Sequence, residues 1–161
     1  MECLYVSVII GSASDLSAMG PCTKILQDFD VPHTVEVYSA HRTPEALVAR
    51  VKELEQSSST RIIICAAGKA AALAGVVSAH THKPVFAVPM KTSMMGGLDS
   101  LLSTVQMPSG VPVASFGVGE SGAANAALMA VRTLALIYPE YREMLEQARK
   151  ERAARILQQN G

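Results

Sequence analysis

Apolar, β-branched runs alternate along the chain with longer segments of helical spacing or composition. The apolar runs predict five strands, at residues 4–11, 33–39, 61–68, 84–89 and 111–119. The intervening segments predict helices at residues 15–30, 43–56, 69–80, 98–107, 121–138 and 139–159. Because strands and helices alternate, consecutive strands are expected to be parallel and joined by right-handed crossovers.

This order predicts a single α/β domain over residues 1–161. We expect a three-layer sandwich built on a flavodoxin-like, doubly wound parallel sheet of about five strands, with a C-terminal helix. That helix, at residues 138–158, is expected to pack on a neighbouring subunit. In such sheets, ligands bind beyond the carboxyl ends of the strands, so these ends are where a site is expected.

Two prolines mark expected helix starts. Thr43, Pro44 and Glu45 fit an N-cap, a first helical position and an acidic first turn. Pro21 lies inside the predicted helix at 15–30, where it either belongs to the first turns or kinks the helix.

Charge and composition narrow the class of protein. Fourteen Lys and Arg residues balance fourteen Asp and Glu residues, which disfavours a nucleic-acid or anionic-membrane binder. Only 17% of residues are charged and 49% are hydrophobic, so we expect a homo-oligomer with large interfaces. Cys3, Cys22 and Cys65 are expected to be reduced thiols in a cytoplasmic protein. No apolar run predicts a membrane span, and no leader is expected.

The segment GSASD, residues 11–15, follows the first predicted strand. Gly11 permits a tight turn, Ser12 and Ser14 offer hydroxyl groups, and a following helix would expose free N–H donors to a phosphate. Asp15 repels phosphate but can accept hydrogen bonds from ribose hydroxyls. The alternative is an ordinary helix cap, since the segment matches neither a Walker loop nor the GxGxxG fingerprint.

The segment SAHR, residues 39–42, follows the second predicted strand. Arginine can hold a phosphate through two hydrogen bonds, and histidine can move a proton near neutral pH. The alternatives are a surface ion pair between Arg42 and Glu45, and a His41 that bonds only to backbone. The position of both residues at the same sheet edge as GSASD favours a site.

Small residues follow the third predicted strand, in AAGKAAALAG at residues 66–75. They leave room for a planar ligand or for a neighbouring subunit, and Lys69 faces either solvent or the pocket. The segment MMGGLDSLLSTVQMPSGVPVA, residues 94–114, is interpreted as a lid or an interface loop.

Metal binding and two other classes of protein are disfavoured. His80 and His82 are two residues apart, a spacing that does not place both rings on one helix face, so no metal site is predicted. A receiver module needs a carboxylate where the third strand ends in CAAG, and a flavin carrier needs clustered aromatic residues.

Taken together, these motifs resemble the PurE family, the 5-(carboxyamino)imidazole ribonucleotide mutases of purine synthesis. The matching segments are GSASD, SAHRTP, AAGKAAALAG, GLDSLLSTVQMPSGVPVA and GAANAAL, in order and spacing, over residues 6–137. The resemblance implies a homo-octamer with sites shared between subunits, a small nucleotide substrate, and no metal or organic cofactor. It also implies transfer of a carboxylate from an exocyclic nitrogen to a ring carbon.

The resemblance also implies roles for individual residues. Ser12, Ser14 and Asp15 would bind the ribose phosphate end, and Ser39 and Arg42 would complete a phosphate clamp. His41 would be the catalytic proton shuttle, and Gly68 with its neighbours would line a pocket for the imidazole ring and carbon dioxide. The full set of candidate substrate-binding residues is Gly11, Ser12, Ser14, Asp15, Ser39, Ala40, Arg42, Ala67, Gly68 and Lys69.

One segment departs from the family pattern. Many members read Gly-Gly-Ala-Ala-His-Leu-Pro-Gly where this chain has Gly68-Lys69-Ala70-Ala71-Ala72-Leu73-Ala74-Gly75. A sister class carboxylates aminoimidazole ribonucleotide directly with carbon dioxide, has arginine after the glycine and lacks the histidine. Lys69 resembles that class, whereas the longer segments at 97–114 and 122–128 favour the mutase.

Overall fold

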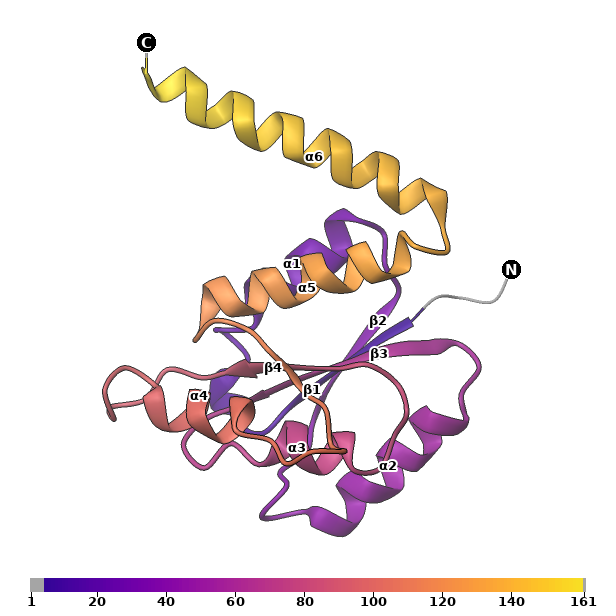
Figure 1. Cartoon of the computed structure of the whole chain (residues 1–161), viewed down its shortest axis with the longest axis vertical. Coiled ribbons are helices and arrows are strands. Elements are labelled where there is room, and N and C mark those ends of the chain that lie inside the picture. Colours follow the sequence, from indigo (N-terminus) through magenta and orange to yellow (C-terminus); the bar gives the residue numbers. More distant parts are fainter. Residues whose placement is uncertain (1–4, 161) are drawn as a thin grey trace.

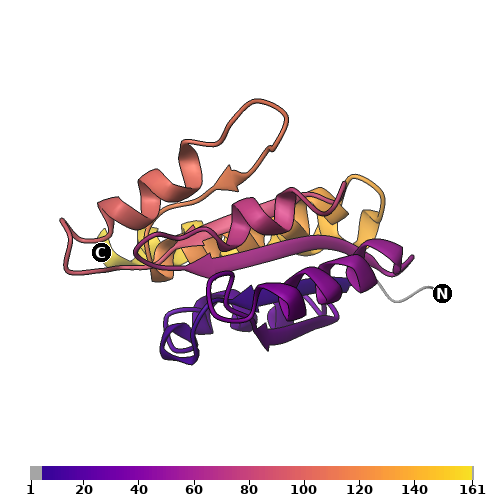
Figure 2. The same ribbon diagram turned by 90° about the horizontal axis from the view of Figure 1, so that it is seen from below.

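The computed structural model describes residues 5–160, which contain one five-stranded sheet (Figures 1 and 2). All paired strands are parallel, and their order across the sheet is β2-β1-β3-β4-β5. The strands are β1 (Tyr5–Ile10), β2 (His33–Val37), β3 (Thr60–Ala67), β4 (Val85–Pro89) and β5 (Ala114–Ser115). The predicted doubly wound parallel sheet is confirmed. Leu4, the predicted start of the first strand, lies outside the described residues.

Helices cover both faces of the sheet and complete three layers (Figure 1). The core residues place α1 and α5 on one face and α2 and α3 on the other. In Figure 1, α6 lies outside the α1–α5 layer and carries the C-terminal end of the chain. The helices are α1 (Gly20–Asp28), α2 (Pro44–Gln56), α3 (Leu73–Ser78), α4 (Leu98–Val105), α5 (Glu120–Leu134) and α6 (Pro139–Leu157), with short 3₁₀ turns at Ala13–Asp15 and Gln158–Asn160.

The central strands are buried on both sides, which explains why their sequences read as continuous apolar runs. Side chains of a strand point alternately to its two faces. Val8 and Ile10 therefore pack with the α1–α5 layer, whereas Ile9 packs with the α2–α3 layer. In the neighbouring strand, Ile64 and Ile63 divide between the two layers in the same way. The sheet thus holds two hydrophobic cores together.

The helix α2 matches its sequence signals closely. Pro44 occupies the first turn, where its missing N–H costs no helical hydrogen bond. Leu47, Val51 and Leu54 recur at helical spacing and are buried against the sheet. The amphipathic pattern therefore fixes both the position of the helix and the face that it buries.

The predicted helix at 15–30 is wrong in its first part. A 3₁₀ turn at Ala13–Asp15 is followed by a turn region, and α1 begins only at Gly20. Pro21 lies in the first turn of α1, as one of the two alternatives predicted. A proline further inside a helix would clash with the preceding turn and remove a hydrogen bond, so the helix starts where the proline is tolerated.

Two other predicted elements are longer than the structure shows. The helix predicted at 69–80 is confined to α3, because Lys69 has a left-handed backbone with φ of 61°. The strand predicted at 111–119 pairs only through Ala114 and Ser115. Pro112 has no N–H for a ladder, and Gly119 turns away with φ of 74°. Both differences arise where the backbone leaves regular geometry near the carboxyl end of the sheet or along its edge.

The start of α5 depends on a close contact between two glycines. A Cβ atom on Gly122 would lie 1.5 Å from the carbonyl oxygen of Gly117. Only a residue without a side chain allows the helix to approach the preceding loop this closely. The segment before α5 is therefore held against the helix by backbone contact.

The thiols of Cys22 and Cys65 are free and buried, and Cys3 lies outside the described residues. Burial raises the pKa of the Cys22 thiol to about 12, and it raises the pKa of Cys65 as well. Neither thiol is therefore a reactive nucleophile near neutral pH.

None of the helices in the described part of the chain has the length and apolar character needed to span a bilayer.

Candidate active site

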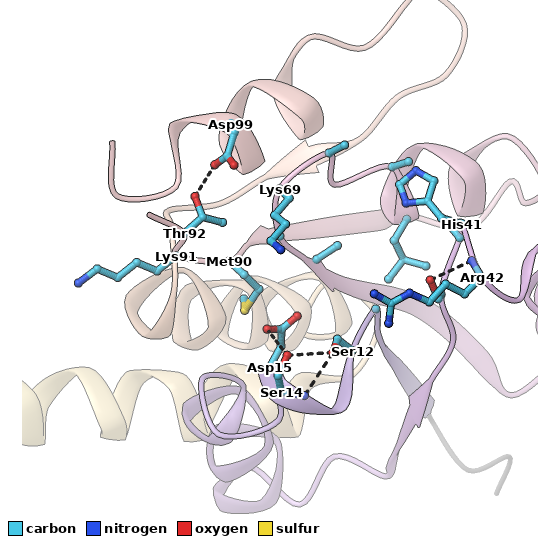
Figure 3. Close-up of a pocket in the computed structure, with 18 of the residues that line it drawn as sticks. Ser12, Ser14, Asp15, His41, Arg42, Lys69, Met90, Lys91, Thr92 and Asp99 are labelled. Atoms are coloured by element: carbon cyan, nitrogen blue, oxygen red, sulfur yellow. Dashed lines mark hydrogen bonds between the residues drawn. The ribbon is translucent and has the colours of Figure 1, made fainter. Parts of the chain in front are cut away.

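A cavity of about 790 Å³ lies at the carboxyl ends of β1, β2, β3 and β4 (Figure 3). It contains every residue that the sequence singled out as a candidate for catalysis or substrate binding. They are Gly11, Ser12, Ser14, Asp15, Ser39, Ala40, His41, Arg42, Ala67, Gly68 and Lys69. The structure thus brings together segments separated by up to 58 positions (69 − 11), as the rule for parallel sheets predicts.

The loop after β1 forms one wall of the cavity. The backbone N–H of Gly11 donates to the carbonyl of Ala66 at 2.8 Å, which joins this loop to the end of β3. The hydroxyl oxygens of Ser12 and Ser14 are 2.8 Å apart, and Ser14 Oγ donates to Asp15 Oδ1 at 3.3 Å. Burial raises the pKa of Asp15, while the hydrogen bond from Ser14 acts in the opposite direction.

The expected helix N-terminus is not part of this wall. The donors predicted to follow GSASD would belong to an α-helix, but α1 begins five positions after Asp15. The 3₁₀ turn at Ala13–Asp15 replaces it, with Ser12 as its N-cap. Hydroxyl groups therefore provide the polar character of this wall, in place of the N-terminus of α1.

The loop after β2 carries His41 and Arg42, whose side chains are exposed and line the cavity. Ser39 organises this loop, because its backbone N–H donates to Thr43 Oγ1 at 3.0 Å and its hydroxyl accepts from the backbone N–H of Arg42 at 3.2 Å. Thr43 occupies the predicted N-cap position, but its hydroxyl bonds to the backbone of Ser39 rather than to the helix. The predicted N-cap position is therefore confirmed, although the Thr43 hydroxyl stabilises the loop that presents His41 and makes no cap hydrogen bond.

The alternative of an ion pair between Arg42 and Glu45 is not realised in the described part of the chain. In Figure 3 the guanidinium group of Arg42 extends into the cavity, toward the side occupied by Ser12 and Asp15. This position allows one cation and two hydroxyl groups to face the same ligand group.

The end of β3 brings Lys69 into the cavity. A Cβ atom on Gly68 would lie 3.3 Å from Met90 Cβ, so this glycine permits the close approach of the β3 and β4 ends. The backbone N–H of Lys69 donates to the buried Ser100 Oγ at 2.8 Å. Its side chain points into the cavity (Figure 3), which answers the question that the sequence left open.

Nine residues that line the cavity are not among the predicted site residues. Three belong to the small-residue segment after β3, and they are Ala70, Ala72 and Leu73. The other six follow β4 or begin α4, and they are Met90, Lys91, Thr92, Ser93, Met94 and Asp99. Their signal was their position after a predicted strand, but the glycines and methionines suggested only a lid or an interface.

A hydrogen bond orders this missed wall. Thr92 Oγ1 donates to Asp99 Oδ1 at 2.6 Å, and the backbone N–H of Ser100 donates to the same oxygen at 2.9 Å. The bond from Thr92, followed by those from Ser100, holds the pKa of Asp99 below its usual value. An ionised Asp99 therefore links the β4–α4 loop to the start of α4.

The two histidines that were considered as metal ligands lie outside this cavity. His80 and His82 line a separate hollow near the amino end of β4, and His82 Nδ1 is 3.1 Å from Glu55 Oε1. Within the cavity, the chemical groups are therefore one imidazole, cations, carboxylates and hydroxyl groups. This set suits a small phosphorylated ligand and a proton transfer.

Comparison with known proteins identifies the family. Residues 5–155 match the family model described as AIR carboxylase. The chain belongs to the AIR carboxylase family. Its resemblance to PurE proteins is supported by relatives named N5-carboxyaminoimidazole ribonucleotide mutase. The protein from Pseudomonas aeruginosa is 45% identical over 152 residues, which cover 94% of this chain and 93% of that protein.

A second relative and a solved structure are also similar to this chain over nearly its whole length. The mutase of Escherichia coli K12 is 41% identical over 153 residues, covering 95% of this chain and 90% of that protein. The crystal structure of PurE from Treponema denticola superposes with a TM-score of 0.87 at 28% identity, covering 96% of this chain and 94% of that chain. The sequence-based recognition of a PurE protein is confirmed.

Inside the cavity itself, the chain departs from the pattern that the sequence comparison attributed to many PurE proteins. Lys69 occupies a position where many PurE proteins have glycine, and its φ of 61° is one that glycine adopts without strain. Ala72 replaces the histidine of that pattern and lines the same cavity. Within the described residues, His41 is the histidine that lines this cavity.

Proposed function

We propose that this protein catalyses the mutase step of purine biosynthesis. The reaction converts N5-carboxyaminoimidazole ribonucleotide to 4-carboxy-5-aminoimidazole ribonucleotide. The observation that carries the proposal is that residues of GSASD, SAHR and AAGKAAAL, distant in the sequence, line one cavity. The relatives from Pseudomonas aeruginosa and Escherichia coli are named for this activity.

The reaction is an isomerisation and needs no oxidant. The bond between the carboxylate carbon and the exocyclic nitrogen breaks, and that nitrogen takes up a proton. The ring carbon then forms a bond to the released carbon dioxide and gives up its own proton, which restores the aromatic ring. A protein that performs both steps has to keep carbon dioxide next to the ring and to move a proton.

The phosphate is assigned to the side of the cavity formed by the β1 and β2 loops. Arg42 extends toward the hydroxyl groups of Ser12 and Ser14 in Figure 3. A guanidinium group and two hydroxyl groups provide charge-assisted hydrogen bonds to phosphate oxygens. Asp15, beside these hydroxyls, would accept hydrogen bonds from the ribose. Gly11, Ser39 and Ala40 complete this side through their backbone or small side chains.

The reacting ring is assigned to the side formed by Ala67 and Gly68, where small side chains leave space. His41 is the proposed proton carrier, since an imidazole both donates and accepts protons near neutral pH. The proposed route uses no metal or organic cofactor, because both bonds change within the substrate. Cavity walls that are close to the ring would limit the escape of carbon dioxide.

The proposed function predicts that turnover of the carboxyamino substrate is independent of added bicarbonate. Carbon dioxide is then a trapped intermediate, so initial rates in carbon-dioxide-depleted buffer are expected to match those with bicarbonate. Initial rates with each nucleotide, followed by absorbance, measure this. The His41→Asn protein provides the background rate. Turnover of aminoimidazole ribonucleotide that saturates at low bicarbonate, without turnover of the carboxyamino compound, would assign direct carboxylation instead.

The protein is further proposed to act in the cytoplasm as a homo-oligomer, with an octamer as the expected form. Leu136 and Ile137, after α5, are 85% and 67% exposed, and Ile156 and Leu157 at the end of α6 are 60% and 69% exposed. Apolar side chains of this size are normally covered when they cluster. We propose that helix 138–158 packs on a neighbouring subunit through Ile156 and Leu157, and that Leu136 and Ile137 before it are covered in the same assembly. The free, buried thiols of Cys22 and Cys65 support a reducing compartment.

Light scattering at micromolar concentration is expected to give a mass several times the 17.0 kDa of one chain. Replacing both Ile156 and Leu157 with serine is expected to reduce that mass, because it removes apolar contact area from the proposed interface. The matched control replaces the exposed Gln147 on α6 with serine. A monomer mass for the unmodified protein would reject the proposal.

A further inference from the structure

Lys69 combines an unusual backbone with an unpaired cationic side chain. Its φ of 61° lies in the left-handed region, which a side chain other than those of Asn or Asp adopts at a cost in free energy. Serines of the α4 segment hold this backbone from both sides, since Ser100 Oγ accepts from its N–H at 2.8 Å and Ser103 Oγ donates to its carbonyl at 3.3 Å. The strained backbone is therefore fixed in place, and with it the direction of the Cα–Cβ bond, while the rest of the side chain stays flexible.

The ammonium group of Lys69 points into the cavity between Asp15 and the β3 end (Figure 3). Among the interactions of residues 5–160, it takes part in no ion pair and no hydrogen bond. Lys91 also lines the cavity, but in Figure 3 its side chain extends away from the centre. Arg42 and Lys69 are thus the two labelled cations that face the centre of the cavity.

The proposed substrate carries two anionic groups, a phosphate and a carboxylate. Arg42 faces the serine hydroxyls of the phosphate side, whereas Lys69 comes from the β3 end, where the ring is assigned. Asp15 adds negative charge to the cavity, so a second anion there needs a second cation. The nitrogen that carries the carboxylate and the carbon that receives it are attached to the same ring atom, and a flexible lysine can follow the group between them.

We propose that Lys69 is a substrate-binding residue that recognises the migrating carboxylate and selects carboxylated nucleotides over aminoimidazole ribonucleotide. This inference rests on the proposed function and adds a specificity determinant to it. Lys69 binds the carboxylate on the exocyclic nitrogen and on the ring carbon alike, and it takes no part in the bond changes. Uniform binding of this kind acts on KM rather than on kcat.

Calorimetric titration of Lys69→Gln with two nucleotides tests the assignment. Glutamine keeps a Cβ atom and similar length but removes the charge. The affinity for 4-carboxy-5-aminoimidazole ribonucleotide is expected to fall roughly tenfold, as for loss of a hydrogen bond to a charged group. The affinity for aminoimidazole ribonucleotide, which lacks the carboxylate, is expected to change less than about twofold by the same reasoning. In turnover of the carboxyamino substrate, KM is expected to rise and kcat to stay within about threefold.

Two further variants separate charge from backbone. Lys69→Arg is expected to recover most of the lost affinity, because it restores the cation. Lys69→Gly relieves the left-handed backbone, so it is expected to unfold at a higher temperature than the unmodified protein while binding the carboxylated nucleotide as weakly as Lys69→Gln. Lys52→Gln, on the exposed surface of α2, is the matched control and is expected to bind both nucleotides normally.

The possible results are distinct. Equal losses for both nucleotides would overturn the inference, because Lys69 would then act on the shared phosphate or ribose. If Lys91→Gln lost as much affinity for the carboxylated nucleotide alone, the inference would be overturned as well. The effect would then come from the total positive charge of the cavity. If the unmodified protein turned over its substrate but Lys69→Gln bound both nucleotides normally, only the role of Lys69 would be rejected. If neither nucleotide bound the unmodified protein, the proposed function would fail, and the inference with it.

Discussion

Replacing His41 with asparagine is expected to lower the turnover number at least about a hundredfold, with little change in nucleotide affinity or assembly. Asparagine retains hydrogen-bonding groups but does not exchange a proton near neutral pH. The side chain of His41 is exposed and belongs to neither hydrophobic core, so its loss leaves the fold intact. Single-turnover rates and calorimetric titration of the same sample separate chemistry from binding. Near-normal turnover by a folded variant would end the assignment of His41 as the proton carrier.

Arg42→Ala is the matched comparison, because it changes the next residue of the same loop. It is expected to weaken nucleotide binding by about 2–4 kcal/mol, the effect of losing a charge-assisted pair to phosphate. Its turnover number at saturation should fall far less than that of His41→Asn. The dephosphorylated nucleoside is expected to bind poorly to the unmodified protein and to be insensitive to the Arg42 change. A nucleoside that bound as well as the nucleotide would contradict the phosphate assignment.

Gly122→Ala is expected to lower the free energy of unfolding by about 3 kcal/mol or more, a large loss for the addition of one methyl group. The new Cβ atom would lie 1.5 Å from the carbonyl oxygen of Gly117 and 2.5 Å from its carbonyl carbon. Both are backbone atoms, so relief requires α5 or the loop before it to move. The midpoint of urea unfolding at fixed protein concentration measures the effect.

Gly20→Ala is the control for this change. A Cβ atom on Gly20 meets nothing within 4 Å, and the residue starts α1. Because alanine favours helix over glycine, its stability is expected to be unchanged or higher by about 0.5–1 kcal/mol. Equal unfolding midpoints for the two variants would show that the contact between Gly117 and Gly122 does not constrain the fold.

The fold could be predicted from the sequence because its strands are apolar and its helices amphipathic. Pro44 and the spacing of Leu47, Val51 and Leu54 indicated α2 almost to the residue. The predicted helix boundaries were wrong where the backbone takes unusual dihedral angles. No pattern of apolar residues reveals that Lys69 adopts a left-handed conformation, so the helix predicted at 69–80 was too long.

The candidate site could be predicted on three strand ends, because GSASD, SAHR and AAGK contain residue types with evident chemistry. The wall after β4 was missed for a physical reason. Thr92 and Asp99 are seven positions apart, and they meet only because Gly96 and Gly97 turn the chain back, with φ of 70° and 109°. That contact depends on three-dimensional geometry that local sequence does not express.

The unequal attachment of the outer strands has a consequence for local unfolding. β1 and β2 are aligned over five residue pairs, whereas β4 and β5 are aligned over two. Segments with few backbone pairs open with a smaller free energy than the whole domain. The cavity is lined by residues that follow β2 and β4, each aligned with its inner neighbour over five pairs, and the chain after β4 continues through α4 into the weakly paired β5. A ligand that contacts Asp99, at the start of α4, is therefore expected to oppose local opening of the segment that leads into β5 by mass action.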